Sequence, residues 1–225
     1  MHKNIVKIVL PGLALGLLLG GCKPKPEATG PEFTVLPGTE ATVLPPENES
    51  AEELDVPKDD GTAFPMLVNG ENGLPEDYAP ELVTEGAKIA VEIADDFADM
   101  RLAAAEEGIV LMVASAFRTY AEQKVLYDEL GAALAQRPGY SEHQTGLAVD
   151  FSYGGLSSAE RDVMWNWLRD NAHSYGFILR YPAGKEGITG IDYEPWHYRH
   201  VGREHAEIIY EQDLVLEEYL AIYTT

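Results

Sequence analysis

The chain has 225 residues, of which 38 are acidic and 16 are basic, giving a formal net charge of −22. Nucleic-acid backbones and anionic membrane surfaces are bound through clustered lysine and arginine, so this charge excludes both kinds of electrostatic binder. The single cysteine excludes an intramolecular disulfide framework and a CxxC zinc ribbon.

The first 21 residues have the layout of a secretory signal. Lys3 and Lys7 form a short basic region, and an apolar run over 8–19 is shorter than the roughly 20 residues that span a bilayer. Two glycines then precede Cys22, as in a bacterial lipobox. We expect cleavage before Cys22 and lipidation of its thiol, which anchors the protein outside the cytoplasm on a bacterial membrane. An ordinary signal peptide with an incidental cysteine is the alternative.

The segment 22–65 is predicted to be a disordered tether. It is rich in proline and glutamate, with acids concentrated between residues 47 and 60. Such a composition cannot bury enough apolar surface to offset the loss of chain entropy, and like charges keep it extended. The remaining residues, 66–225, are predicted to form one domain.

Periodic segments of this domain predict helices and short strands in alternation. Apolar residues recur every three or four positions between 84 and 107, and Gly108 ends that pattern. Ser157-x-x-Glu160 has the form of a capping box. The connections are too short for regular βαβ units, so we expect an α+β domain with a small, mostly antiparallel sheet and flanking helices. The expected helices are 84–107, 120–134, 157–173 and 203–219, and the expected strands are 109–113, 146–152, 177–181 and 196–201.

Two short motifs contain the residue types of a metal site. Gly146 permits a tight turn between His143 and Asp150. Further along, Pro195 forces an extended segment between Glu194 and His197. Two histidines and one aspartate suit a catalytic zinc ion, and a free glutamate nearby suits a general base. On spacing alone, structural histidines and an ion-paired aspartate remain the alternative.

We expect two further histidines and two tryptophans to have structural positions outside the metal site. We expect His173 near the end of a helix, where positive charge is favourable, and His205 on the solvent-facing side of the last helix. Trp165 and Trp167 are two residues apart on one helix and cannot share a face, so one should be buried and the other partly exposed.

Several blocks, in the same order, resemble the VanY-type zinc D-alanyl-D-alanine carboxypeptidases, a family that includes L,D-carboxypeptidases. The similarity covers nearly all of residues 66–202. The blocks are Ser115-Ala-Phe-Arg118-Thr-Tyr120-x-x-Gln123, Ser141-x-His143-x-x-Gly146-x-Ala148-x-Asp150, Gly176-Phe-Ile-Leu-Arg180-Tyr181, and Tyr193-Glu194-Pro195-Trp196-His197-x-Arg199-x-Val201-Gly202.

The resemblance implies a hedgehog/DD-peptidase-like zinc peptidase domain holding one Zn²⁺ per chain. It implies that His143, Asp150 and His197 bind the metal and that Glu194 is the catalytic acid and base. Arg118 would stabilise the oxyanion or hold the substrate carboxylate. The two remaining site residues, Ser141 and Gln123, would contact the terminal D-residue.

The sequence therefore predicts a tethered, monomeric zinc D,D-carboxypeptidase that removes the terminal D-Ala from peptidoglycan stem peptides. Two alternatives stay open. One is an L,D-carboxypeptidase that acts on the tetrapeptide. The other is a non-catalytic, cell-wall-binding lipoprotein, which predicts a lost ligand or base.

Overall fold

A computed structural model describes residues 65–224 of the chain. The predicted signal peptide, Cys22 and the tether up to residue 64 lie outside these residues, so the domain boundaries stay a prediction. Within residues 65–224, no helix is both long enough and apolar enough to cross a bilayer.

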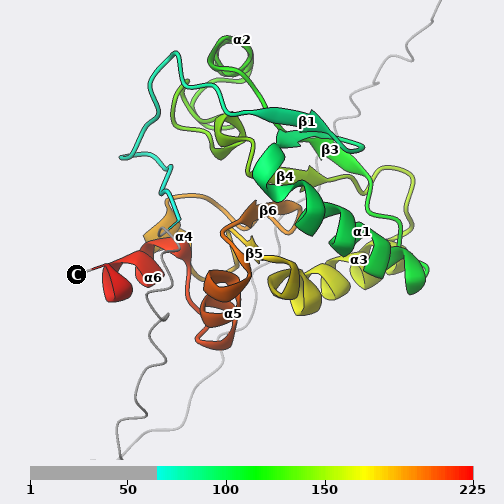
Figure 1. Ribbon diagram of the computed structural model, residues 1–225. Coiled ribbons are helices and arrows are strands. Elements are labelled where there is room, and N and C mark those ends of the chain that lie inside the picture. The colour runs from blue at the N-terminus through cyan, green and yellow to red at the C-terminus, as the bar shows by residue number, and fades with distance from the viewer. Residues whose placement is uncertain (1–64, 225) are drawn as a thin grey trace, which may run out of the picture. The chain divides into compact units, whose positions relative to one another are not determined.

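The centre of the domain is a four-stranded sheet with the strand order β3-β4-β6-β5 (Figure 1). Every neighbouring pair in it is antiparallel. A separate antiparallel ribbon is formed by β1 and β2. The expected α+β class with a small antiparallel sheet is therefore confirmed. The strands are β1 Leu82–Thr84, β2 Lys88–Ala90, β3 Val113–Ser115, β4 Ala148–Phe151, β5 Phe177–Leu179 and β6 His197–His200.

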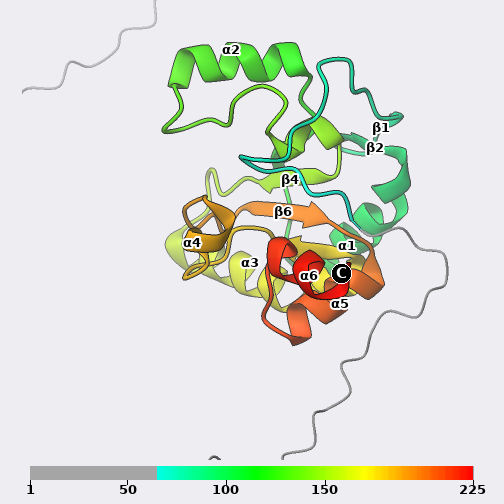
Figure 2. The ribbon, with the colours of Figure 1, turned by 90° about the vertical axis from the view of Figure 1, so that its left-hand side faces the viewer.

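Two long helices, α1 and α3, cover one face of this sheet, and the functional residues lie on the other side. Phe97 and Met100 of α1 pack with Met164 and Leu168 of α3 against Val149 of β4, and all five are buried. Helix α2 lies on the opposite side of the sheet from α3 (Figures 1 and 2). The helices are α1 Ala94–Glu106, α2 Tyr120–Leu130, α3 Ser158–Asn171, α4 Glu186–Thr189, α5 Arg203–Glu211 and α6 Leu216–Tyr223, and the 3-10 turns are η1 Val91–Ile93, η2 Glu142–Thr145 and η3 Ala172–Tyr175.

The predicted start of the third helix is confirmed by its side chains. The Ser157 hydroxyl accepts from the Glu160 backbone N–H at 3.3 Å, and the Glu160 carboxylate accepts from the Ser157 N–H at 2.8 Å. Both orphan N–H groups are thus satisfied. Trp167 is buried while Trp165 is only partly so, as expected from their spacing.

The predicted helix over 84–107 is wrong over residues 84–93. The chain there makes the β1–β2 hairpin and the turn η1, and α1 starts only at Ala94. Gly86 adopts a φ of 75°, a conformation that favours glycine and reverses the chain. Ile89 and Ile93 are fully buried, so the apolar spacing located the core correctly although Ile89 belongs to a strand.

Two other predicted elements are displaced. Val110 and Met112 of the expected strand 109–113 are exposed, and the strand that pairs with β4 starts at Val113 instead. The expected last helix divides into α5 and α6, because Asp213 takes a positive φ of 51° between them. Against our expectation, His205 is buried: its Nδ1 lies 2.6 Å from the Tyr219 hydroxyl, where α5 packs on α6.

Candidate active site

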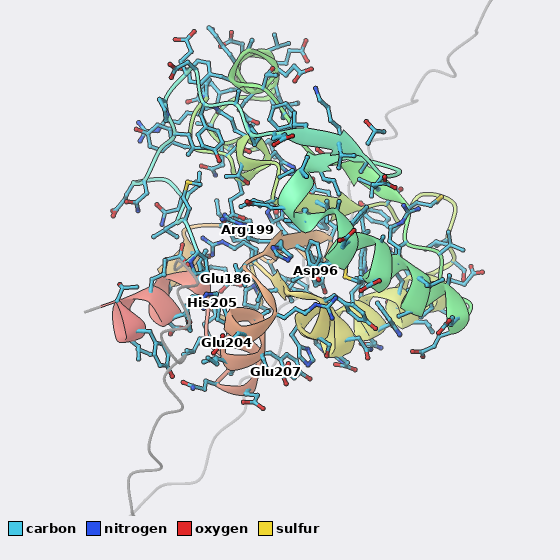
Figure 3. All side chains as sticks on the ribbon, viewed as in Figure 1. Asp96, Glu186, Arg199, Glu204, His205 and Glu207 are labelled. Carbon is cyan, nitrogen blue, oxygen red and sulfur yellow. The ribbon has the colours of Figure 1, made fainter. Side chains whose placement is uncertain are left out.

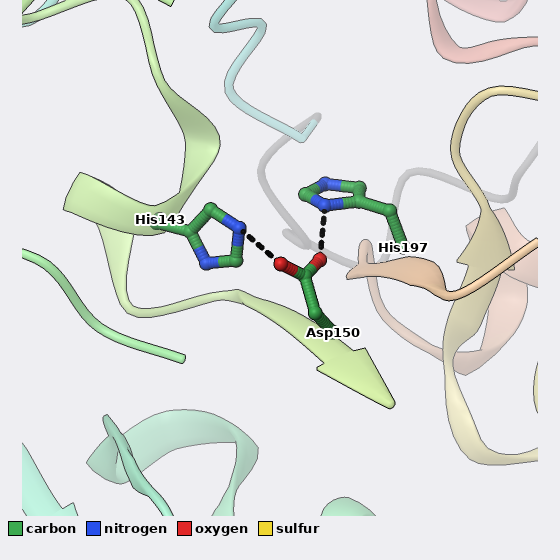
Figure 4. A group of neighbouring side chains, drawn as sticks. All are labelled: His143, Asp150 and His197. Carbon is green, nitrogen blue, oxygen red and sulfur yellow. Dashed lines mark hydrogen bonds and ion pairs between the residues drawn. The ribbon is translucent and has the colours of Figure 1, made fainter. Parts of the chain in front are cut away.

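Adjacent strands and one turn position the three predicted metal ligands. Asp150 of β4 lies directly opposite His197, the first residue of β6. His143 comes from η2, which Gly146 ends with a φ of 73° so that the chain can turn into β4. A Cβ on that glycine would lie 3.0 Å from the backbone nitrogen of Ala90, so the turn has no room for a side chain. The three side chains consequently point toward one another (Figure 4).

The Asp150 carboxylate lies between the two imidazole rings. Its Oδ2 is 3.2 Å from His143 Nε2, and its Oδ1 is 2.8 Å from His197 Nδ1. One ligand atom from each of the three residues lies within 4.8 Å of the other two. Two imidazole nitrogens and one carboxylate oxygen form the protein part of a catalytic zinc shell that keeps a position open for water.

The ring nitrogens that face away from Asp150 also have partners. His143 Nδ1 lies 2.8 Å from the carbonyl oxygen of Ala116, and His197 Nε2 lies 3.2 Å from Glu142 Oε2. An acceptor on the far side of each ring holds the proton there and leaves the other nitrogen free to bind a metal. The donor set therefore fits zinc.

Burial and the neighbouring ionisable groups act in opposite directions on the pKa values of these three side chains. Burial lowers the pKa of His143 despite the adjacent Asp150 charge, which favours a neutral ring with a free lone pair. Burial also acts to lower the pKa of His197, but Asp150 and Glu142 raise that pKa to about 9. Burial acts to raise the pKa of Asp150, yet its contacts with His143 and His197 hold it well below its usual range. The carboxylates thus favour a positive charge on His197, whereas burial disfavours one on His143.

The ligands open onto a cleft of about 600 Å³. One wall is formed by α2 and the alanine-rich segment 132–135, and the other by Tyr181 and the segment 190–194. Glu194, the predicted general base, lines this cleft together with the ligands. Burial raises the pKa of Glu194, and the negative charge of Asp150 acts in the same direction. A carboxyl group with a raised pKa is suited both to accept and to return a proton.

Arg118 enters the same cleft and is held by two side chains. Its Nη1 donates to Gln123 Oε1, and its Nη2 donates to Ser115 Oγ at 2.8 Å. Gln123 is buried and its amide nitrogen donates to the Gln136 carbonyl at 2.5 Å. Gln123 also lines the cleft, so its predicted contact with the substrate stays a prediction. In the structure its side-chain oxygen holds the Arg118 guanidinium.

Ser141, the remaining predicted substrate contact, also lines the cleft. It directly precedes η2, yet its side chain makes no capping hydrogen bond there. Capping of the turn therefore does not account for this hydroxyl, which leaves it available to the cleft.

Sequence reasoning missed Glu142, which lies directly behind His197. Only 3% of the residue is exposed. Burial acts to raise the pKa of Glu142, but the guanidinium groups of Arg180 and Arg199 hold it well below its usual range. Both arginines occur in the blocks quoted from the sequence, so a search for the partners of two buried cations could have found this carboxylate.

Comparisons with known proteins agree with this arrangement. The family described as VanY, D-alanyl-D-alanine carboxypeptidase, matches residues 86–203. A D-alanyl-D-alanine carboxypeptidase of Enterococcus faecalis is 38% identical over 216 residues, which cover 80% of each chain.

Two solved structures share the fold. One is a mutant of the vancomycin-resistance D,D-pentapeptidase VanY from a VanB-type cassette in complex with Zn(II), with a TM-score of 0.62 and 40% identity, covering 69% of this chain and 97% of that one. The other is the LdcB LD-carboxypeptidase, with a TM-score of 0.63 and 40% identity, covering 69% of this chain and 84% of that one.

Proposed function

The chain belongs to the VanY family of D-alanyl-D-alanine carboxypeptidases, and from this premise we propose how its residues act as a zinc D,D-carboxypeptidase. The substrate is a peptidoglycan stem peptide, from which the enzyme removes the terminal D-Ala by hydrolysis. His143, Asp150 and His197 hold one zinc ion. Bound zinc supplies Lewis-acid chemistry, which polarises a carbonyl and makes water more acidic.

Glu194 transfers the proton in this proposal. Its carboxylate accepts a proton from the attacking water while the water oxygen bonds to the scissile carbonyl carbon. The same group then returns that proton to the departing amine of D-Ala as the carbon–nitrogen bond breaks. The partly buried position of Glu194 on the cleft wall, with its raised pKa, suits both steps.

Arg118 recognises negative charge on the substrate. A guanidinium can bind a terminal carboxylate or an oxyanion through paired N–H donors. Gln123 and Ser115 fix its orientation from behind. Ser141, which also lines the cleft, contributes a hydroxyl to the terminal residue.

One observation carries this function: the three ligand atoms lie within 4.8 Å of one another in a cleft that Glu194 also lines. The test is release of D-Ala from a stem pentapeptide by the purified, zinc-loaded protein. We expect Glu194→Gln to lose roughly 10²–10⁴-fold in kcat, the usual contribution of a general base, with zinc still bound. Glu186→Gln, the same change at the first residue of α4, is the matched control, because Glu186 is not among the residues that line the cleft. Equal turnover by wild type and Glu194→Gln would refute the mechanism.

A second function, L,D-carboxypeptidase activity on the tetrapeptide, is favoured by the 40% identity to LdcB. Incubation with pentapeptide and tetrapeptide in parallel separates the two. Faster release from the pentapeptide supports the D,D activity, and faster release from the tetrapeptide supports the L,D activity. Turnover of neither, with no zinc at one equivalent, would instead favour the non-catalytic wall-binding protein.

We further propose that the mature protein is a monomer attached to the extracytoplasmic face of a bacterial membrane through lipidated Cys22. The support is the signal-like segment before Cys22 and the acidic, proline-rich segment after it. Cell fractionation tests the anchor: wild type should sediment with membranes, and Cys22→Ala should not carry lipid. Sedimentation of the lipid-free protein at the mass of a dimer would contradict the monomer.

A further inference from the structure

The carboxylate of Glu142 divides its two oxygens between the metal site and a buried pair of arginines. Glu142 Oε2 lies 3.2 Å from His197 Nε2. Glu142 Oε1 accepts from Arg180 Nε at 2.8 Å and from Arg199 Nη1 at 2.9 Å. The hydrogen bonds to Oε1 fix the carboxylate, and the fixed carboxylate presents Oε2 to the imidazole ring.

His197 has its two nitrogens in different surroundings. Its Nδ1 lies 2.8 Å from Asp150 Oδ1, and its Nε2 lies 3.2 Å from Glu142 Oε2. An ionised carboxylate only accepts hydrogen bonds, so it holds a proton on Nε2 and leaves the lone pair of a neutral ring on Nδ1. We propose that Glu142 is a positioning residue that fixes the tautomer and ring orientation of His197 for zinc binding through Nδ1. The proposal rests on the zinc site of the proposed function.

The two histidine ligands are supported differently. Behind His143 is a neutral backbone carbonyl, that of Ala116. Behind His197 is a charged side chain, which polarises the ring more strongly and makes its free nitrogen a better ligand. Glu142 therefore contributes to zinc affinity through His197 and not through His143.

The arginines keep this buried carboxylate ionised. Arg180 and Arg199 are both fully buried, and a buried charge needs a partner to offset its lost hydration. Glu217 of α6 completes the network by accepting from both terminal nitrogens of Arg180, at 2.8 Å and 2.6 Å. Two acids and two arginines thus balance one another, with only Glu142 reaching the metal site.

Glu217 offers a matched control for Glu142. Glu142→Gln and Glu217→Gln each remove one negative charge from the same network while keeping the shape of the side chain. In Glu142→Gln the two arginines retain the amide oxygen, so the NH₂ group faces His197 Nε2. That donor forces the imidazole proton onto Nδ1, the nitrogen that should bind zinc.

The experiment measures zinc affinity of the full chain by competition with a chromophoric chelator, alongside thermal stability of the zinc-free proteins. We expect zinc binding to weaken about 10–100-fold in Glu142→Gln and less than about threefold in Glu217→Gln, although both variants melt at lower temperature. Glu142→Asp, which keeps an acceptor, should recover part of the affinity. An unchanged affinity in Glu142→Gln, or an equal loss in Glu217→Gln, overturns the proposal.

A measurement on the wild type keeps the proposal testable if the Glu142 variants do not fold. Nitrogen-15 NMR of the zinc-loaded protein should find the proton of His197 on Nε2, and a proton on Nδ1 overturns the assignment. Neither readout needs substrate. Zinc binding without D-Ala release would therefore refute the proposed function and leave this inference standing on its own test.

Discussion

The two ends of strand β6 carry similar histidine–aspartate pairs with different surroundings. At its start, His197 Nδ1 lies 2.8 Å from Asp150. At its end, His200 Nε2 lies 2.8 Å from Asp96 on α1. The second oxygen of Asp150 faces another imidazole, whereas that of Asp96 accepts from the Arg203 guanidinium at 2.7 Å. Asp96 and the strand residue Arg199 can be located in Figure 3.

This difference separates a metal site from a structural ion pair. A guanidinium has no lone pair to offer a metal, and its charge already balances Asp96. Around Asp150, by contrast, two ring nitrogens converge with the carboxylate, so that one bound metal ion could contact all three. A histidine next to an aspartate is therefore not sufficient evidence for a metal site. A second side chain must also direct a lone pair toward the same aspartate, as His143 does toward Asp150.

The largest expected difference between the two ends is in catalysis and zinc binding. Asp150→Asn removes a ligand, so we expect zinc affinity and kcat/KM to fall by more than ~100-fold, the upper range for loss of a residue that merely supports a ligand. Asp96→Asn should keep both within about twofold. Chelator competition and D-Ala release measure the two quantities. Comparable losses in the two variants would show that the ends of β6 are not functionally distinct.

A smaller difference in kcat/KM is expected between variants of Arg118, which lines the cleft, and of Arg203, which pairs with Asp96. Arg118→Lys keeps the charge in the cleft but loses the fixed fork of donors, so kcat/KM should fall about 10²-fold. Arg203→Lys, on the exposed side of Asp96, should leave it unchanged. Steady-state kinetics also assigns the role of Arg118: a raised KM indicates carboxylate binding, and a lowered kcat indicates oxyanion stabilisation. An unchanged kcat/KM in Arg118→Lys would show that the guanidinium of Arg118 is not needed for the reaction.

The smallest expected effect concerns acid stability at the Asp96 end. Burial acts to raise the pKa of Asp96, but hydrogen bonds from His200 and Arg203 lower it. Asp96 is therefore more acidic in the folded chain than its ordinary value of about 3.9. Its stabilising contribution is present above that value and is lost as the pH falls through the lowered pKa. Asp99 also pairs with Arg203, and the negative charge of Glu92 acts on His200.

Asp96→Asn should consequently be about 0.2–1 kcal/mol less stable than wild type at pH 6, the range for a solvent-screened pair. The difference should shrink as the pH is lowered from 5 to 3. Denaturant unfolding at several pH values, with Asp99→Asn as the control on the same arginine, measures this. A constant difference across that range would show that Asp96 does not titrate with unfolding as expected.

Much of the candidate site could be predicted because its residues lie close together in sequence. His143 and Asp150 share one short motif, and Glu194 and His197 share another, so the resemblance could assign each position directly. Glu142 stands beside His143 in the same motif, but its partners Arg180 and Arg199 are 38 and 57 residues away. Pairing across such distances depends on strand order, which periodicity alone does not specify.

The errors in secondary structure have a local origin instead. Ile89, Ile93, Phe97 and Met100 are all fully buried, so their spacing predicted the core face correctly. Helical spacing does not show where a helix starts, and only the positive φ of Gly86 marks the hairpin before it. The interruption of the last helix at Asp213 depends on a left-handed backbone at a non-glycine residue, for which sequence gives little signal.

The register of β4 against β6 couples the packing of the apolar core to the alignment of Asp150 with His197. Asp150 opposes His197 while Val149 opposes Tyr198, and both Val149 and Tyr198 belong to the buried core. Successive side chains of a strand point to opposite faces, so a slip of one residue would turn Tyr198 toward the cleft and His197 toward the helices. A slip that separated Asp150 from His197 would therefore also unpack Val149 and Tyr198 from the core.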